Sequence, residues 1–272
     1  MSIPSDTLTP RRKQNNGDTK FMIIALLVIL LGGGSLFFLN RLTTPPDPTS
    51  ADIPSPDPAT PAITAEKVDE LFTKARHQKG AIAGADLTIV EFADFECPSC
   101  RIAYDQTLKT WDAKLPSHRM AFYQFPLPMH PRAVPAVVAS EAAAKQGKFW
   151  EIYAVLFDKD SEGLDDAKIV AAAKKAGLDM TRFDADIKNG APFKALTDAD
   201  TKAGAANGVD STPTFFFRDK SGSVAVLSGS INLGRLLPDL KDGVIGNDAI
   251  KPADPARGQP FTVYINGKKE SR

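Results

Sequence analysis

The fold is decided by residues 87–100, which read LTIVEFADFECPSC. Residues 87–92 are rich in β-branched side chains and almost wholly apolar, a pattern that predicts a buried strand. Cys97 and Cys100 follow, and Pro98 suits the first position of a helix because its missing N–H is not needed there. The stretch therefore predicts a strand, a short turn and a helix that begins at a CxxC motif.

A CxxC motif at the start of a helix is suited to disulfide exchange, because the attacking group in that reaction is a thiolate. Unpaired N–H groups and the positive end of the helix dipole would face the sulfur of Cys97 and favour its negative form. Cys100 lies one helical turn further along, close enough to form a disulfide with Cys97. We expect Cys97 to be the exposed attacking thiol and Cys100 the buried resolving thiol.

The same motif could instead be half of a zinc site. A structural zinc site needs two further ligands, and the chain has no other cysteine. The histidines His77, His118 and His130 are isolated, with no pair at i,i+3 or i,i+4. We therefore expect no metal and no other cofactor. His130 could reach the rim of the CxxC site, although a lone histidine beside prolines is more often structural.

Two of the acidic residues before the cysteines are candidates for a role in the site. Glu91 interrupts the apolar strand six residues before Cys97. If buried there, its carboxyl group would have a raised pKa and could pass a proton to or from Cys100. The alternative is a strand residue that faces solvent. Asp94 could cap or shape the loop, and no catalytic role is assigned to it. Glu91 is the predicted proton relay.

The rest of the globular part alternates between strand and helix patterns. The expected elements are a helix over 66–78 that ends at Gly80, a strand over 119–125, a helical block over 132–206, a hairpin of strands 214–218 and 224–227 around the turn 219–222, a helix over 231–240, and a further strand over 261–265 with no predicted neighbour. Strands separated by helices imply parallel pairing, and the hairpin adds antiparallel strands. The sequence predicts an α/β fold, with a mixed central sheet flanked by helices on both faces.

Residues 21–39, FMIIALLVILLGGGSLFFL, form an uninterrupted apolar stretch. A helix of about 20 residues crosses the hydrocarbon core of a bilayer, so we expect one transmembrane anchor here. Basic residues gather before it, and only Arg41 follows closely. This asymmetry places residues 1–20 in the cytoplasm and the rest of the chain outside it. The expected location is the inner membrane, single-pass, with the catalytic domain periplasmic or extracytoplasmic.

A cleaved signal peptide is the competing interpretation of this stretch, with Gly33 and Ser35 as small residues for a protease. The apolar run is longer than the usual 7–15 residues and continues beyond them, which favours an uncleaved anchor. The predicted layout of the chain is a cytoplasmic segment 1–20, an anchor 21–39, a proline-rich linker 40–65, a folded domain 66–245 and a C-terminal extension 246–272.

Charge and cysteine content exclude other classes of protein. The chain carries 33 Lys and Arg residues and 33 Asp and Glu residues, so its formal net charge is zero. Binding to nucleic acid needs a basic excess or a basic face, so no nucleic-acid partner is expected. Two cysteines three positions apart also differ from the scattered cysteines of a small secreted scaffold stapled by disulfides.

Three ordered motifs carry a family resemblance: VEFADFECPSC at 90–100, FPLPMHPRAVPAVVASEAAAKQGKFWEIYAVLF at 125–157 and GVDSTPTFFF at 208–217. Together they resemble the DsbA-like branch of the thioredoxin superfamily over about residues 66–243. The resemblance implies a thioredoxin fold with a helical domain inserted at about 131–206, between the second strand and the strand that follows a cis-proline.

The resemblance also implies roles for single residues. Cys97 and Cys100 carry over as the redox pair, able to close a disulfide, and Glu91 aligns with the buried acidic residue of the family. Pro213 carries over as the cis-proline packed against the cysteines, whereas the sequence alone indicates only the start of a strand. Thr212 would offer backbone pairing to an extended substrate.

The dipeptide between the cysteines departs from part of the family. It is Pro98-Ser99, where strongly oxidising relatives carry Pro-His, so a histidine that assists the thiolate is missing from the motif. The hydroxyl of Ser99 stabilises a thiolate less than a cation does. Threonine before the cis-proline also occurs in isomerase branches. The resemblance therefore leaves the direction of electron flow open.

The expected function is a thiol–disulfide oxidoreductase that forms or rearranges disulfide bonds in exported proteins. An oxidase is favoured over an isomerase or reductase, because the chain shows no dedicated dimerisation domain. The expected partners are exported protein thiols or disulfides and a membrane redox partner that recycles the CxxC pair. Two alternatives stay open: a membrane-tethered chaperone or assembly factor that uses the fold as a peptide-binding module, and a metal-binding module.

Overall fold

The structure is a computed structural model of the chain, and it describes residues 63–81, 84–115, 117–229, 245, 262–265 and 268–271. These residues belong to one compact unit, Pro56–Arg272. The predicted anchor, most of the predicted linker and the predicted helix over 231–240 lie outside the described residues. None of the helices described is long and apolar enough to cross a membrane.

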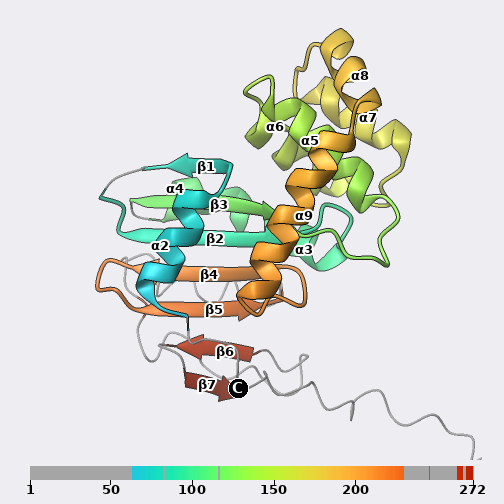
Figure 1. Cartoon of the computed structure of the whole chain (residues 1–272). Helices are drawn as coiled ribbons and strands as arrows, with labels where there is room; N and C mark the ends of the chain where they lie inside the picture. The colour runs from blue at the N-terminus through green and yellow to red at the C-terminus, as the bar shows by residue number, and fades with distance from the viewer. Residues whose placement is uncertain are drawn as a thin grey trace, which may run out of the picture. The chain divides into compact units, whose positions relative to one another are not determined.

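The described strands form one mixed sheet in the order β1-β3-β2-β4-β5-β6-β7 (Figure 1). Their bounds are β1 His77–Gly80, β2 Leu87–Ala93, β3 His118–Gln124, β4 Thr214–Asp219, β5 Val224–Ser228, β6 Thr262–Ile265 and β7 Lys268–Ser271. β2 and β3 run parallel, and every other neighbouring pair is antiparallel. The expected strand at the C-terminus is β6, and its neighbours are β5 and β7.

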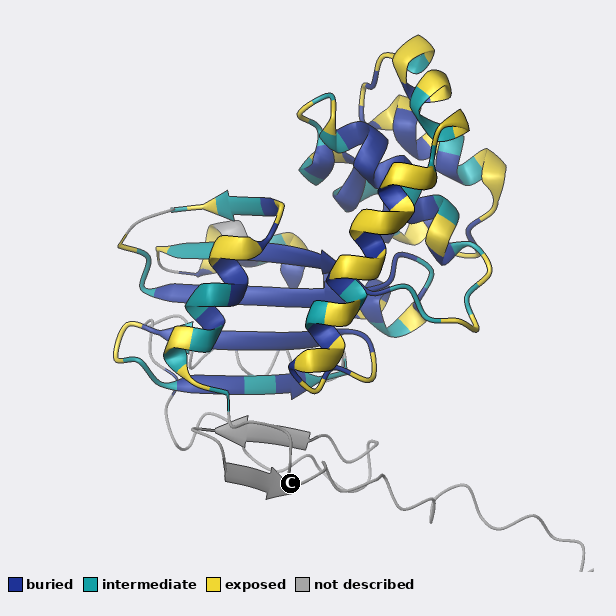
Figure 2. Ribbon diagram, in the orientation of Figure 1, coloured by how far each residue is buried: buried dark blue, intermediate teal, exposed yellow. Residues whose placement is uncertain are grey.

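β2 lies inside the sheet, between β3 and β4, and both of its faces are buried (Figure 2). Ile89 and Ala93 belong to the core on one face, which includes residues of helix α3 (Pro98–Gln106) and helix α4 (Trp111–Lys114). Val90 and Phe92 belong to the core on the opposite face, which includes the apolar side of helix α2 (Ala65–Lys74). The predicted mixed sheet with helices on both faces is confirmed.

The sequence-based boundary of the first helix is wrong. α2 ends at Lys74 rather than Gln78, and the next residues form strand β1, which pairs with β3. The side-chain amide of Gln78 donates to the carbonyl oxygens of Phe72 and Ala75, at 2.8 and 2.9 Å, and thereby caps the helix end. The hydrogen bonds between β1 and β3 join segments that are far apart in sequence. These tertiary contacts override the local helical pattern of the residues after Lys74.

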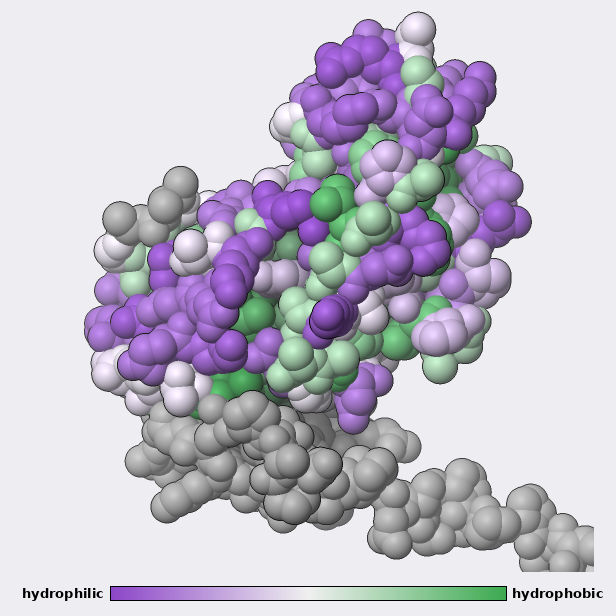
Figure 3. Space-filling model, in the orientation of Figure 1, coloured by the Kyte–Doolittle hydropathy of each residue, from purple (hydrophilic) through white to green (hydrophobic). Residues whose placement is uncertain are grey.

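Five helices lie between β3 and β4, as the helical block predicts. They are α5 Ala133–Ala144, α6 Phe149–Phe157, α7 Asp166–Lys175, α8 Met180–Lys188 and α9 Ala191–Ala206. The stretch that reads as one helix over 137–157 is two helices, because Gly147 has φ +73° and ends the first of them. α9 packs against both α5 and β3, and hydrophilic side chains cover α2, α7 and α8 on the visible face (Figure 3).

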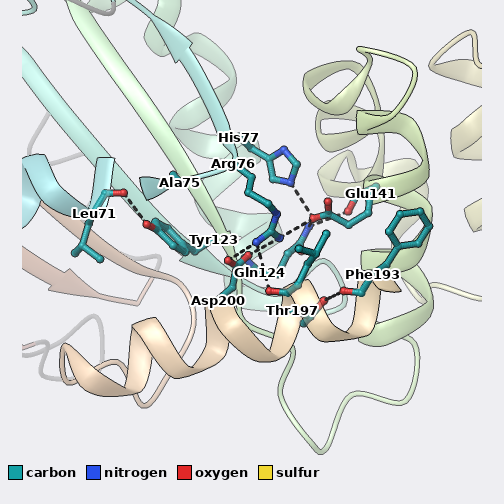
Figure 4. Close-up of polar contacts among 12 residues, drawn as sticks. Leu71, Ala75, Arg76, His77, Tyr123, Gln124, Glu141, Phe193, Thr197 and Asp200 are labelled. Atoms are coloured by element: carbon teal, nitrogen blue, oxygen red, sulfur yellow. Dashed lines mark hydrogen bonds and ion pairs between the residues drawn. The ribbon is translucent and has the colours of Figure 1, made fainter. Parts of the chain in front are cut away.

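A polar cluster, buried except for the partly exposed Arg76, joins the helices to the sheet (Figure 4). Arg76, beside β1, binds both carboxylate oxygens of Asp200 on α9 at 2.7 and 2.8 Å. It also binds Glu141 on α5 at 3.1 Å. Glu141 accepts further hydrogen bonds from His77 at 2.8 Å and from the Gln124 amide at 3.2 Å. Burial alone would raise the pKa of Glu141, but the bonds from His77 and Arg76 outweigh it and hold the pKa below its ordinary value.

Gly204 allows α9 to lie close to the sheet, and we expect Gly204→Ala to destabilise the domain. A Cβ atom there would lie 2.7 Å from the Phe125 ring and 3.0 Å from the Phe92 ring. Such overpacking costs about 1–3 kcal/mol, which outweighs the gain of about 1 kcal/mol in helix propensity. Chemical denaturation measures the loss. Lys202→Ala, exposed on the same helix, is the control, and a Gly204→Ala variant more stable than the wild type would contradict the expectation.

Candidate active site

Cys97 lies where the sequence predicts, at the junction between β2 and α3. The turn after β2 is closed by a hydrogen bond from the Cys97 N–H to the Asp94 carbonyl, at 3.1 Å. Cys97 is the N-cap of α3, Pro98 is the first residue of the helix, and Cys100 follows in its first turn. Pro98 is exposed and Ser99 is half-buried. Both cysteines are free thiols.

The surroundings of Cys97 favour its thiolate and lower the pKa of Cys97 to about 6. The largest cause is the hydrogen bond from the Cys100 thiol, which outweighs the effect of burial. The hydroxyl of Thr212 and the N–H groups of Ser99 and Cys100 lower the pKa further. Cys97 makes no regular capping hydrogen bond to the first turn of α3, so these N–H groups contribute less than the Cys100 thiol.

The prediction that Cys97 lies open to solvent is wrong, because only 5% of the residue is exposed. Its sulfur lies beneath the loop before β4, where the Thr212 carbonyl accepts a hydrogen bond from the thiol at 3.5 Å. Cys100 is completely buried, as expected, and burial together with the charge of Cys97 raises the pKa of Cys100. The two thiols therefore differ in acidity more than in exposure.

Glu91 is completely buried, so the alternative of a solvent-facing strand residue is wrong. The hydroxyl of Tyr153, on α6, donates to Glu91 Oε2 at 2.7 Å, and Oε1 has no partner. Burial raises the pKa of Glu91 to about 8. The negative form of Glu91 would raise the pKa of Cys100 through its charge, which shows that the two groups interact. A carboxyl group that is mostly protonated at neutral pH therefore lies within electrostatic range of the buried thiol.

Asp94 shapes the loop before Cys97, one of the roles that the sequence left open. Its Oδ1 accepts from the Glu96 N–H at 2.8 Å, and its Oδ2 accepts from the Leu127 N–H at 2.8 Å. Oδ2 also binds His130 Nδ1 at 2.7 Å. The Asp94 carboxylate thus ties the CxxC loop to the loop that follows β3.

The loop before β4 completes the site. The peptide bond between Thr212 and Pro213 is cis, as the family resemblance implies. Both residues are buried, and the Thr212 hydroxyl forms no regular hydrogen bond. It is therefore a donor without a competing partner, placed to approach the sulfur of Cys97 in its thiolate form.

Arg101 was missed by sequence reasoning. Its guanidinium donates to the carbonyls of Leu156 and Asp158, at 3.1 and 2.8 Å, and so holds the end of α6 to the CxxC helix. It also contacts the Phe95 carbonyl at 3.5 Å. Burial lowers the pKa of Arg101, and the nearby negative groups, both cysteines among them, oppose that effect. A basic residue directly after the second cysteine was the available signal, but its partners lie about 55 residues away in sequence.

Tyr153 was also missed, because it lies within an aromatic stretch of α6 that reads as ordinary core. His130, which the sequence places within possible reach of the rim of the site, binds Asp94. Among the residues that the structure describes, no three His, Cys, Asp or Glu side chains are grouped as metal ligands would be. The described site is thus built from two thiols, two buried carboxyl groups, one imidazole and the cis-proline loop.

Comparison with known proteins places these features in a family. A family model described as thioredoxin matches residues 78–225. The Na(+)/H(+) antiporter NhaA of Herminiimonas arsenicoxydans is 36% identical over 135 residues, which are 48% of this chain and 21% of that protein. The chain thus spans about a fifth of the length of the curated relatives it matches.

Solved structures with the same fold include a thioredoxin-like oxidoreductase from Silicibacter pomeroyi, with a TM-score of 0.50 and 25% identity, covering 64% of this chain and 95% of that one. The thiol-disulfide exchange protein alpha-DsbA2 from Wolbachia pipientis has a TM-score of 0.53 and 17% identity, covering 65% of this chain and 92% of that one. At 17% identity the likeness shows the fold alone. The expected thioredoxin-like α/β fold is confirmed, and the chain belongs to the thioredoxin family.

Proposed function

We propose that this chain is a thiol–disulfide oxidoreductase that forms or rearranges disulfide bonds in exported proteins through Cys97 and Cys100. The observation that carries the proposal is the opposite shift of the two thiols. The pKa of Cys97 is lowered to about 6, whereas the pKa of Cys100, in the first turn of the same helix, is raised. The pair therefore offers one reactive thiolate, Cys97, and one thiol that stays protonated, Cys100.

In the oxidising direction, the disulfide between Cys97 and Cys100 accepts two electrons from a substrate dithiol. A substrate thiolate attacks the Cys97 sulfur, the Cys97–Cys100 bond breaks, and a mixed disulfide forms as Cys100 leaves and takes up a proton. The second substrate thiolate then attacks the substrate sulfur of the mixed disulfide. The substrate disulfide forms, and Cys97 leaves as a thiolate.

The acidity of Cys97 favours this direction, because a thiol of lower pKa leaves faster and its thiolate is the more stable product. Oxidation is therefore proposed over isomerisation or reduction. Glu91 is proposed as the proton relay for Cys100. With a pKa of about 8 its carboxyl group can both give and accept a proton near neutral pH. Thr212 and Pro213 are proposed to receive the substrate backbone, which would reach Cys97 beside the exposed Pro98 and displace the Thr212 contact.

We propose that the enzyme works outside the cytoplasm on a membrane anchor. The apolar stretch 21–39 and the proline-rich linker 40–65 support this location. The proposed partners are exported proteins with free or mispaired thiols, and a membrane redox protein that reoxidises the reduced Cys97–Cys100 pair by accepting its two electrons.

Oxidation of a dithiol peptide by the oxidised protein tests the function. We expect Cys97→Ser to abolish turnover. Cys100→Ser, mixed instead with the disulfide form of the peptide, should accumulate a mixed disulfide, because its Cys97 thiolate breaks the peptide disulfide and the resolving thiol is missing. Mass spectrometry detects the adduct. Ser211→Ala, an exposed position in the cis-proline loop, is the control and should retain turnover. Full activity of Cys97→Ser, or failure of the wild type to oxidise the peptide, would rule out the proposed reaction.

A further inference from the structure

The loop between β3 and α5 lies against the CxxC loop through paired contacts. Asp94 binds the Leu127 N–H and the His130 ring, and the Glu96 carboxylate accepts a hydrogen bond from the Arg132 N–H. The side chain of Asp94 is completely buried, and that of His130 is 18% exposed. Neither loop can therefore move without breaking hydrogen bonds to the other, and the His130 ring is fixed beside the turn that carries Cys97.

The hydrogen bond from His130 to Asp94 uses one ring nitrogen, Nδ1. Among the described residues the structure shows no hydrogen-bond partner for the other nitrogen, Nε2. No neighbouring donor therefore opposes a proton on Nε2. The carboxylate of Asp94 favours the doubly protonated, positive ring. In the turn from Asp94 to Cys97, the Cys97 N–H binds the Asp94 carbonyl, so the His130 ring, bound to the Asp94 carboxyl group, lies beside the turn that ends at Cys97.

We propose that His130, oriented by Asp94, is the cationic partner that stabilises the Cys97 thiolate, in place of a histidine in the dipeptide Pro98-Ser99. The inference rests on the proposed function and adds a positioning residue to the same site. His130 forms no bond to the substrate. It keeps its proton throughout the exchange and lowers the free energy of Cys97 as the leaving thiolate.

The charged groups around the pair agree with this role. Burial would lower the pKa of His130, but Asp94, Cys97 and Glu96 together raise it. Cys97 also interacts electrostatically with Arg101 and with Cys100. Arg101 stays positive at all working pH values and is bound to three carbonyls. His130 is therefore the cation near Cys97 whose charge changes with pH, and its removal leaves the contribution of Arg101 in place.

Thiolate absorbance of the reduced protein as a function of pH tests the inference. His130→Gln keeps a donor for Asp94 but removes the charge. We expect its ratio of Cys97 thiolate to thiol, near pH 6, to fall about three- to tenfold. His130→Arg should restore the ratio, because it returns a positive charge that can bind Asp94. His118→Gln, at the opposite end of β3, should behave as the wild type. A His130→Gln variant with an unchanged titration would overturn the inference.

A reciprocal measurement keeps the inference testable if His130→Gln does not fold. Two groups that stabilise each other's charge must do so equally, so Cys97→Ser should lower the pKa of the His130 ring in NMR titrations. An unchanged ring titration would also overturn it. A failure of this inference is distinguishable from a failure of the proposed function. Peptide oxidation by the wild type tests the function, whereas these titrations test only which cation stabilises the Cys97 thiolate.

Discussion

Arg76→Met is expected to destabilise the folded domain by about 3–5 kcal/mol at neutral pH, because it leaves two buried carboxylates without their cation. The side chain of Arg76 contacts both Asp200 and Glu141, whose residues are 5% and 4% exposed. Methionine keeps the apolar stem of arginine but lacks the guanidinium, so the loss reports the charge and its hydrogen bonds. Denaturant titration followed by circular dichroism measures it.

The deficit of Arg76→Met should shrink as the pH falls. Burial already raises the pKa of Asp200, and Arg76 opposes that effect. Without Arg76 the folded-state pKa of Asp200 rises further above its unfolded value, and the pKa of Glu141, now held below its ordinary value, rises as well. Folding then takes up protons, and stability falls as the pH rises from about 4 toward neutrality. At acid pH both carboxyl groups are protonated in both states, and the charge penalty disappears.

Lys194→Met is the matched control, because it removes the exposed ion pair between Lys194 and Asp198 on α9, the helix that carries Asp200. Exposed pairs contribute less than about 1 kcal/mol. A loss of that small size in Arg76→Met, or a loss equal at pH 4 and pH 7, would mean that the polar cluster is not held by its charges.

Glu91→Gln is expected to stabilise the domain while slowing its chemistry. The pKa of Glu91 is raised from 4.5 to about 8, so the folded state keeps a proton that the unfolded chain loses. Stability is therefore unaffected below pH 4.5 and is lost as the pH rises toward 8, by about 1.4 kcal/mol for each pH unit. Glutamine abolishes this loss and still accepts the Tyr153 hydroxyl. We expect a gain of about 2–4 kcal/mol at pH 7.

The gain should be absent at pH 4 and largest above pH 8, and urea titrations across this range measure it. Glu151→Gln, an exposed carboxyl group on α6, should change stability by less than about 0.5 kcal/mol. Peptide oxidation should slow in Glu91→Gln at the step where Cys100 gains or loses its proton. A variant with unchanged stability at all pH values would show that Glu91 is ionised in the folded protein.

Local signals were enough to predict β2 and the CxxC helix, because an apolar β-branched stretch and a proline at a helix start act within a few residues. β1 was missed because its formation depends on pairing with β3, about 40 residues away in sequence. The buried position of Glu91 was predictable from its apolar neighbours. The burial of Cys97 was not predictable, because its contact with Thr212 spans 115 positions and no sequence pattern indicates it.

The same limit applies to the polar contacts of the site. Asp94 and His130 were each considered, but nothing in their spacing of 36 residues shows that they meet. Arg101 reads as a surface residue of a helix, and only the folded chain brings the end of α6 to its guanidinium. The family resemblance supplied Pro213 and the helical insertion, which the residues alone would have left as a strand start and a run of helices.

The order of the strands affects the tendency of the protein to aggregate at high concentration. The described sheet ends in β1 on one side and in β7 on the other, and each has only four residues. The sequence of β7 is KKES, rich in charge. Short, charged border strands offer little template for a second chain to join. The long apolar strands β2, β3 and β4 are thereby kept from fibril-like stacking with neighbouring copies.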